Sequence, residues 1–498
     1  MVVRNVAELL ARASHRHPDA AVGMVGESMT ISSVYRAARD TAHMLNNAGL
    51  RSGDAVVLLG TNSNEWLISW MALQIAGART ALLNPTLPDD LLATVAAPLR
   101  PWAAICTDAG RHIGGLAPRV FDLSPNGEGR RSERAGTAAG ADRAAESLAG
   151  FDMRDSDIST YMLTSGTSGP PKLVAQSHAY FLSLGRYVAD QLGITRYDTV
   201  LTTLPLFHIN PLGYAVLGAL SGEANWLVAE RFSASKFWPM VRDNNVSITV
   251  LHGPPLEILK RRTTLDDARG HRLRSVLYAD PEFLERFEVP IGLSVYGSTE
   301  GGGLSAVHRW RAGDVATSTE RATQYGGGAR PGFTNEIAED GEIVVTAERP
   351  DLLGSGYVAM DGGLTPLAPD GRFRTGDRGY LDDCAGLTFV ARQSESIRVK
   401  GEFVPINYVE DHFRASLTGI DDLAIWKRSS DLADDEIVLY LQGDPISLDN
   451  LRSASSRLPA FMRPAHVVRL ETLPRDTAVG KTRRRELASA PAIERADL

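Results

Sequence analysis

Continuous apolar runs alternate with helical patterns in the first three hundred residues, and this alternation constrains the fold more than any other feature. Residues 55–59, AVVLL, are apolar throughout, as in a strand that is buried on both faces of a parallel sheet. Residues 66–76 then show a helical pattern that Gly77 is expected to end. The segment WAAICTD at 102–108 predicts another buried strand. We therefore predict an α/β protein with layered β-sheets and flanking helices.

The residue composition and the apolar pattern change along the rest of the chain. Residues 124–150 are rich in small and charged residues without an apolar period, which is typical of a surface loop or linker. Short apolar segments separated by glycines between 341 and 390 predict antiparallel strands. A smaller unit with a helix and two strands is expected after a boundary at 392–395. The predicted domains are residues 1–393 and residues 394–498.

Charge and cysteine content argue against several kinds of partner and of structural cross-link. The 498 residues include 52 basic and 60 acidic side chains, a net charge of -8, and no basic run. This argues against nucleic acid or an anionic membrane as the partner. Two distant cysteines, Cys106 and Cys384, cannot form a disulfide framework or a zinc site alone. With no signal-peptide pattern and no apolar stretch long enough to span a bilayer, we expect a soluble cytoplasmic protein.

The segment YMLTSGTSGPPKLVAQSH at 161–178 concentrates hydroxyl side chains, glycines and one cation. Gly166 and Gly169 allow backbone N–H groups to face one concavity, and Lys172 adds a positive charge. Such a loop suits a polyphosphate, although it lacks the Walker A pattern. A serine- and glycine-rich surface turn remains the simpler alternative for this segment.

Three further motifs suggest nucleotide chemistry. The segment YGSTE at 296–300 follows an apolar strand, where α/β sheets bind ligands, so Thr299 suits a phosphate and Glu300 suits Mg²⁺. In FRTGD, Asp377 is expected in a tight turn, where its carboxylate suits two ribose hydroxyls, and Arg392 suits the same ribose or a phosphate. Lys481 lies in a glycine-containing loop before a basic helix. Ordinary turns and a solvated basic helix are the alternatives.

In their order and spacing these motifs resemble the adenylate-forming superfamily of acyl-CoA ligases, peptide-synthetase adenylation domains and luciferases. The resemblance covers nearly the whole chain and includes LPLFHIN, RTGD, VKGEF and PRDTAVGKTRRREL. It implies a large N-terminal domain with a small β-barrel-like subdomain, and a smaller mobile α+β C-terminal domain. It also implies two steps. A carboxylate attacks the α-phosphorus of ATP to form an acyl-adenylate, and the thiol of coenzyme A then attacks the adenylate.

The resemblance assigns a role to each candidate residue. Tyr296 would pack on the adenine, Thr299 would touch the α-phosphate and Glu300 would ligate Mg²⁺, and Gly297 is a further cofactor-binding candidate. Lys481 would neutralise charge during adenylation, and His208 would gate the acyl pocket near the thiol tunnel. Gly401 would line the pantetheine tunnel. The residues implied for the β- and γ-phosphates are Thr164, Ser165, Gly166, Thr167 and Lys172, and those implied for the ribose are Asp377 and Arg392.

Some positions depart from the superfamily pattern. Tyr278, Ala279 and Asp280 replace a glycine-rich turn that normally packs against adenine, so their side chains would narrow or recharge the nucleotide pocket. The usual hinge residue is Ser394. Further departures are Ala391 for a glycine, Arg398 for a frequent lysine, and Leu173, which stand-alone aryl-acid ligases of the family share.

These departures leave four hypotheses open. The leading one is an acyl-CoA ligase (ATP-dependent carboxylate–CoA ligase) for a hydrophobic aryl, alicyclic or medium acyl carboxylate. The second is a stand-alone enzyme that loads a carrier protein. The third is a variant that performs only thioesterification of a pre-formed acyl-adenylate. The last is a catalytically silent nucleotide- or acyl-binding protein, which the presence of Asp377, Arg392 and Lys481 together disfavours.

Overall fold

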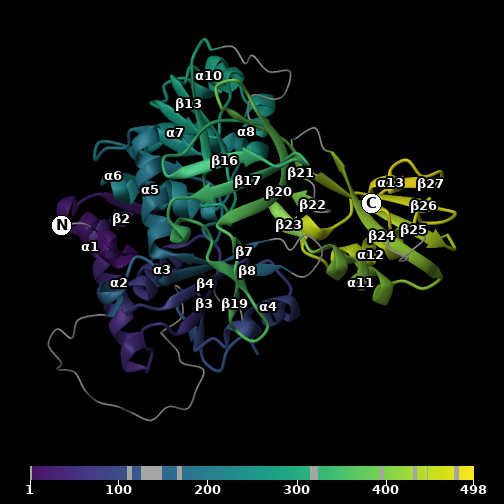
Figure 1. The fold of residues 1–498 in the computed structure, drawn as a ribbon, viewed down its shortest axis with the longest axis horizontal. Helices are drawn as coiled ribbons and strands as arrows, with labels where there is room; N and C mark the ends of the chain where they lie inside the picture. Colours follow the sequence, from purple (N-terminus) through teal and green to yellow (C-terminus); the bar gives the residue numbers. More distant parts are fainter. Residues whose placement is uncertain are drawn as a thin grey trace. The chain divides into compact units, whose positions relative to one another are not determined.

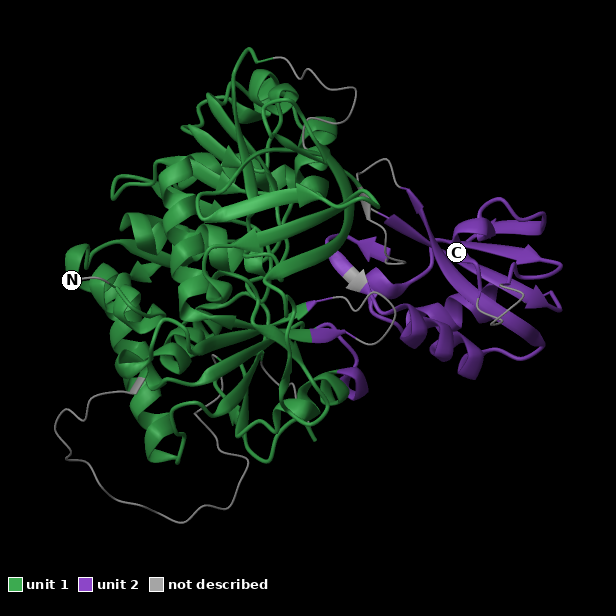
Figure 2. Cartoon of the chain, viewed as in Figure 1, with its two compact units in different colours: residues 1–85, 92–163, 173–391 green, residues 86–91, 164–172, 392–498 purple. Residues whose placement is uncertain are grey.

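The computed structural model describes residues 3–108, 115–124, 149–164, 171–314, 324–392, 397–429, 435–445, 447–475 and 482–498. Two compact units divide the chain (Figure 2). The first contains residues 1–85, 92–163 and 173–391, and the second contains residues 86–91, 164–172 and 392–498. Most of the linker expected at 124–150 lies outside the described residues.

An eight-stranded sheet forms around the strand predicted at residues 55–59. This strand, β3, is buried at every residue and pairs in parallel with β4 and β5, as its apolar run predicts. The strand order is β19-β18-β8-β7-β4-β3-β5-β6. The strands are β3 (Ala55–Leu59), β4 (Arg79–Leu83), β5 (Ala103–Cys106), β6 (Val120–Asp122), β7 (Ile158–Thr164), β8 (Lys172–Ser177), β18 (Gly356–Val358) and β19 (Leu364–Thr365).

A second sheet of thirteen strands joins a parallel part to an antiparallel part. Strands β1, β10, β9, β11, β12 and β13 run parallel in that order, and β13 pairs antiparallel with β14. The antiparallel strands expected between 341 and 390 continue this hydrogen-bonded order. The strands are β1 (Ala21–Met24), β2 (Met29–Thr30), β9 (Thr199–Thr202), β10 (Asn225–Val228), β11 (Ile248–Val250), β12 (Ser275–Leu277), β13 (Ile291–Tyr296), β14 (Ala306–Arg311), β15 (Tyr325–Ala329), β16 (Phe333–Ile337), β17 (Glu342–Ala347), β20 (Arg372–Leu381) and β21 (Leu387–Arg392).

Helices of the first unit pack on these sheets, and α3 lies against β3 and β4 (Figure 1). Gly77 ends α3 in the left-handed conformation, as predicted. The main core contains Val56 of one sheet, Val200 of the other and Trp70 of α3. The helices are α1 (Val6–Arg16), α2 (Ile31–Asn47), α3 (Asn64–Ala76), α4 (Asp89–Ala96), α5 (His178–Leu192), the π-helix η3 (Asn210–Val216), α6 (Leu217–Gly222), α7 (Ala234–Asp243), α8 (Gly253–Arg262), α9 (Leu265–Ala268) and α10 (Pro281–Phe287), with short 3₁₀ segments η1 (Ala97–Leu99), η2 (Ala149–Asp152) and η5 (Pro350–Leu352).

The second unit contains the smaller α+β structure expected near the C-terminus. A hairpin of β22 and β23 precedes a four-stranded sheet in the order β24-β25-β26-β27. Its elements are β22 (Ile397–Val399), β23 (Glu402–Val404), α11 (Ile406–Ser416), β24 (Ile420–Ser429), β25 (Asp435–Gly443), α12 (Leu448–Ser456), η6 (Ala460–Met462), β26 (His466–Leu470), α13 (Arg484–Leu487) and β27 (Ala492–Asp497). Across the described parts of both units, no helix combines the length and the apolar character needed to cross a bilayer.

Candidate active site

The candidate site begins where the parallel strands of the larger sheet end. Strands β9, β11, β12 and β13 are neighbours, so their carboxyl ends lie along one edge. Tyr296 is the last residue of β13, as the sequence predicts for the YGSTE motif. This edge is where open α/β sheets bind ligands. We call residues 297–304, which follow β13, the site turn.

Gly297 allows the site turn to fold back on itself. A Cβ at this position would lie 1.8 Å from the carbonyl oxygen of Gly303. Within the turn, the Ser298 hydroxyl accepts from Gly301 N at 3.0 Å, and the Ser298 carbonyl accepts from Gly303 N at 3.0 Å. The backbone approach therefore requires glycine at 297.

Donors from several elements hold the carbonyl groups of the site turn. The Tyr180 hydroxyl and the Gln176 amide donate to Thr299 O at 3.0 and 3.3 Å. Gly354 N donates to Glu300 O at 2.8 Å, and the Tyr214 hydroxyl donates to Gly303 O at 3.2 Å. Donors from α5, β8 and η3 thus fix the backbone beside Thr299 and Glu300.

Arg330 also donates hydrogen bonds to the site turn. It is only 2% exposed, and its Nη1 donates to Gly302 O and Leu304 O at 3.0 and 3.2 Å. Its Nη2 donates to the Ser183 hydroxyl at 2.6 Å, and its guanidinium stacks on the ring of Phe333 at 4.6 Å. Burial lowers the pKa of Arg330 to about 10, which leaves it charged at neutral pH.

Glu300 offers a carboxylate suited to a hard cation. Its Oε1 accepts a hydrogen bond of 3.2 Å from the Tyr357 hydroxyl of β18. The described residues contain no cluster of three or more metal-ligating side chains. Mg²⁺ typically uses one or two carboxylates together with phosphates and waters, so a single glutamate fits this ion.

Tyr296 and Asp377 lie in direct contact. The Tyr296 hydroxyl donates to Asp377 Oδ2 at 2.9 Å, and the Tyr296 ring stacks on Phe389 with centroids 6.2 Å apart. The sequence suggested that Asp377 lies in a tight turn. The structure instead places it inside the ten-residue strand β20. A register shift against β17, with Gly376 at φ +73°, forms a bulge there. The local Gly-Asp sequence is typical of a turn. The bulge could not be predicted from it, because the bulge depends on the pairing of β20 with β17.

The predicted phosphate loop is described only at its ends. Thr164 is the last residue of β7 and is buried, and Lys172 is the first residue of β8 and is exposed. Ser165, Gly166 and Thr167 lie outside the described residues. The strand that begins with Lys172 also carries Gln176, which donates to the site turn.

His208 precedes the π-helix η3 and contacts Phe207, with ring centroids 4.5 Å apart. π-Helical segments are rare and frequently occur at functional sites. The same helix carries Tyr214, which donates to Gly303 O, so the segment after His208 packs on the site turn.

The altered turn at 278–280 has an unusual backbone. Tyr278 follows β12 and has φ +67°, a left-handed conformation that is rare for a residue with a side chain. Asp280 caps α10 by accepting from Phe283 N at 2.9 Å and pairs with Lys260 Nζ at 2.9 Å. Burial opposes the charge of Lys260, but the hydrogen bonds that its ammonium group donates to Glu282, Glu257 and Asp280 outweigh burial and raise its pKa. Lys260 Nζ also pairs with Glu257 and Glu282, so Asp280 shares this one cation with two other carboxylates.

The second unit carries the remaining candidates. Gly401, at φ +83°, and Lys400, at φ +54°, form the turn between β22 and β23. Positive φ at both positions is typical of a tight hairpin turn that favours glycine. Arg392 ends β21, but its side chain is not described, and Lys481 and Ser394 lie outside the described residues.

A buried ion pair anchors the segment that follows Lys481. Glu410 of α11 is 4% exposed and accepts from Arg484 Nη2 at 2.7 Å and from Ile425 N at 2.9 Å. An isolated antiparallel bridge pairs Arg475 with Thr482, the described residues on either side of 476–481. These contacts fix both ends of the segment that contains Lys481.

We expect Glu410→Gln to weaken adenylation at least about tenfold more than thioesterification of a pre-formed adenylate. The substitution leaves Arg484 without its buried counter-charge and so loosens the Lys481 segment. Pyrophosphate exchange and thioester formation measure the two steps separately. Glu494→Gln, which removes an exposed pair with Arg469, is the control and should change neither step. Equal losses in both steps would contradict this expectation.

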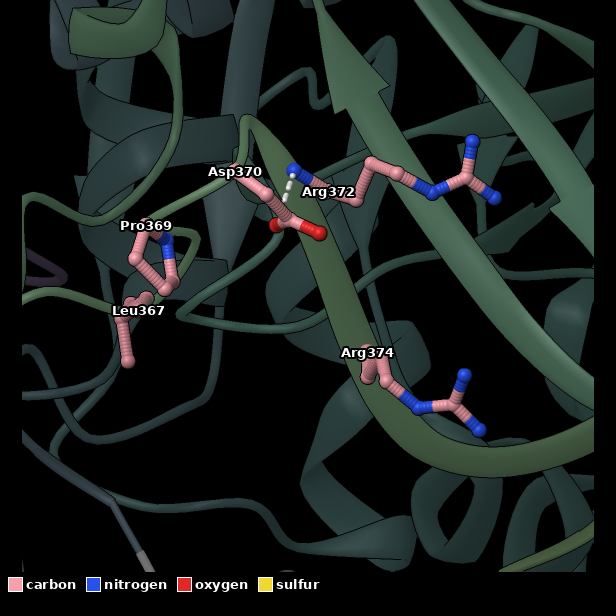
Figure 3. Close-up of a pocket in the computed structure, with 5 residues that line it drawn as sticks. All are labelled: Leu367, Pro369, Asp370, Arg372 and Arg374. Atoms are coloured by element: carbon pink, nitrogen blue, oxygen red, sulfur yellow. Dashed lines mark hydrogen bonds between the residues drawn. The ribbon is translucent and has the colours of Figure 1, made fainter.

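A surface pocket of about 500 Å³ also lies on the first unit (Figure 3). Its arginines already have carboxylate partners. Arg372 pairs with Glu336 at 2.6 Å, and Arg374 pairs with Asp340 at 2.7 Å. None of the predicted site residues lines this pocket, and we assign no function to it. The lining residues are Leu367, Pro369, Asp370, Arg372 and Arg374.

The chain belongs to the AMP-binding enzyme family, whose model matches residues 10–354. It is 26% identical over 489 residues to crotonobetaine/carnitine–CoA ligase of Salmonella arizonae, covering 90% of this chain and 91% of that protein. These findings confirm the predicted superfamily and the class of enzyme, an ATP-dependent carboxylate–CoA ligase of the adenylate-forming kind.

Solved structures confirm the predicted fold class. The structure of o-succinylbenzoate CoA synthetase from Bacillus subtilis with a bound product analogue has a TM-score of 0.81 and 21% identity, covering 98% of this chain and 99% of that one. The same synthetase in complex with ATP and magnesium has a TM-score of 0.65 and 22% identity, covering 96% and 99%. At 21–22% sequence identity, the similarity to these structures shows the fold alone.

Proposed function

We propose that the protein is an ATP- and Mg²⁺-dependent acyl-CoA ligase for a largely hydrophobic carboxylic acid. The observation that carries the proposal is the site turn, where buried donors hold Thr299 and Glu300 beside the Tyr296–Asp377 pair. Fixed groups of this kind stabilise developing charge without reorganisation during the reaction. The ligase relatives and the ATP–magnesium complex of the Bacillus subtilis synthetase support the choice of substrates.

In the proposed first step, an oxygen of the substrate carboxylate bonds to the α-phosphorus of ATP and pyrophosphate leaves. Tyr296 would pack on the adenine, Gly297 would belong to the cofactor-binding residues, and Thr299 would donate to the α-phosphate. Mg²⁺, held by Glu300, would neutralise phosphate charge. The residues proposed for the β- and γ-phosphates are Thr164, Ser165, Gly166, Thr167 and Lys172, those for the ribose are Asp377 and Arg392, and the cation for the reacting oxygens is Lys481.

In the proposed second step, the thiol of coenzyme A attacks the acyl carbonyl and AMP leaves. His208 would border the acyl group near the incoming thiol, and Gly401 would line the pantetheine path. We propose residues 394–498 as a domain that moves between the steps. A cytoplasmic location remains part of this proposal.

Two alternatives remain within the superfamily. A carrier-protein thiol could replace coenzyme A, as the Leu173 context suggests. An enzyme restricted to thioesterification would be expected if residues 278–280 disabled nucleotide binding. The contacts of Asp280 favour the full ligase, because this carboxylate caps α10 and binds Lys260 and so already has partners within the protein.

Exchange of labelled pyrophosphate into ATP, driven by a panel of carboxylic acids, tests the adenylation step. Acid-dependent exchange is expected, and Glu300→Gln should lower it at least about tenfold and raise the Mg²⁺ concentration needed for half-maximal exchange. Glu339→Gln, at an exposed position of the same unit, should behave as wild type. Exchange that does not depend on Glu300 would contradict its proposed role.

A further inference from the structure

Asn210 has a buried hydrogen-bond acceptor at the sheet edge that forms the candidate site. Its Nδ2 donates to Leu251 O at 3.0 Å, and Leu251 directly follows β11. A carbonyl oxygen can only accept, so this contact fixes the orientation of the amide. The other atom, Oδ1, is buried and receives no hydrogen bond from the described residues.

Among the described residues this arrangement is unfavourable. A buried acceptor without a donor costs about 1–3 kcal/mol, and native proteins contain few such groups. Asn210 is also the first residue of the π-helix η3, a conformation that is itself rare. Two unfavourable features at one residue point to a ligand that supplies the missing donor.

The position of Asn210 relates it to the acyl group of the proposed adenylate. Tyr214, four residues later in η3, donates to Gly303 O of the site turn. Through Asn210 and Tyr214, η3 thus contacts both Leu251, which follows β11, and the site turn, which follows β13, and only β12 separates these two strands.

We infer that Asn210 Oδ1 selects acyl groups that carry a neutral hydrogen-bond donor, a hydroxyl or an N–H group. The inference rests on the proposed ligase function and narrows its substrate class. An amide oxygen has no net charge to balance a buried cation, so a neutral donor is the better match. The expected substrate is a mainly apolar acid with a donor at one position of its skeleton.

The test uses the full-length protein with ATP, Mg²⁺ and coenzyme A, and pairs of aryl and medium-chain acids that differ by one hydroxyl or amino group at successive positions. Acyl-CoA formation gives kcat/KM for each acid. One donor-bearing acid should exceed its parent by at least about tenfold, because a site built to bind a donor discriminates against the analogue that lacks it. Asn210→Leu should reduce this ratio to about twofold or less while the parent acid still reacts.

Asn244→Leu is the matched control. Asn244 also donates through Nδ2 to a backbone carbonyl, Met240 O, at 2.9 Å, but it lies at the end of α7. This variant should keep the wild-type ratio. Thermal unfolding checks that each variant folds, and Asn210→Ala provides a second variant if the leucine variant unfolds.

Two results would overturn the inference while leaving the ligase proposal intact. One is a ratio near one for every pair that forms a thioester, and the other is a wild-type ratio in the Asn210 variants. A lack of both pyrophosphate exchange and thioester with every acid would instead overturn the proposed function, and the inference with it.

Discussion

Replacing Gly297 with alanine is expected to lower acyl-CoA formation by about a hundredfold or more and to lower the melting temperature. The new Cβ would lie 1.8 Å from Gly303 O, a backbone atom that cannot rotate away. The site turn would have to open, which moves Thr299 and Glu300. Misplacement of catalytic groups by about 1 Å costs on the order of a hundredfold in rate, and overpacking costs roughly 1–3 kcal/mol of stability.

Gly328→Ala is the control for this prediction. A Cβ at Gly328, in the nearby strand β15, would meet no atom within 4 Å. Its activity and melting temperature should match those of the wild type. Steady-state thioester formation and calorimetry measure the two effects. A fully active Gly297→Ala enzyme would show that the site turn does not position the reacting groups.

Arg330→Met is expected to produce the second large effect. The arginine donates to Gly302 O, Leu304 O and the Ser183 hydroxyl, and no carboxylate of the described residues pairs with it. Methionine preserves the apolar stem but leaves these acceptors without donors. At about 1 kcal/mol for each lost hydrogen bond, we expect a stability loss on the order of 3 kcal/mol. We also expect at least about a tenfold loss of kcat as the site turn loosens.

Arg330→Lys separates the charge from the hydrogen-bond geometry. Lysine keeps the positive charge, but it cannot reproduce the planar fork of the guanidinium. If geometry positions the site turn, the lysine variant should lose nearly as much kcat as the methionine variant. If charge alone matters, it should retain most of the activity. Wild-type stability and kcat in Arg330→Met would contradict the supporting role of this residue.

Local sequence patterns predicted much of the fold. The apolar run of β3 and the glycine that ends α3 depend on neighbours within the same segment, so both could be read from the sequence. The position of Asp377 could not, because the bulge in β20 arises from its pairing with β17. The continuation of the parallel sheet into antiparallel strands also depends on long-range pairing.

Motifs indicated the residues of the proposed nucleotide site but not those that hold the site turn. Tyr296 and Asp377 were expected at one nucleotide site, and the structure brings their side chains into contact. Arg330, Tyr180 and Asn210 were missed because their importance depends on which distant carbonyl each one contacts. The arginine in GGGARPGF, within an apolar and glycine-rich context, was the one local signal of a buried cation.

The central claim is that one chain performs both adenylation and thioesterification. Mass spectrometry of products from free carboxylic acids, ATP, Mg²⁺ and coenzyme A tests it most directly, with pre-formed acyl-adenylates plus coenzyme A in parallel. The account predicts acyl-CoA and AMP from both mixtures. Thioester from the pre-formed adenylates alone would contradict the claim, and it would direct attention to Tyr278, the left-handed residue that directly follows β12.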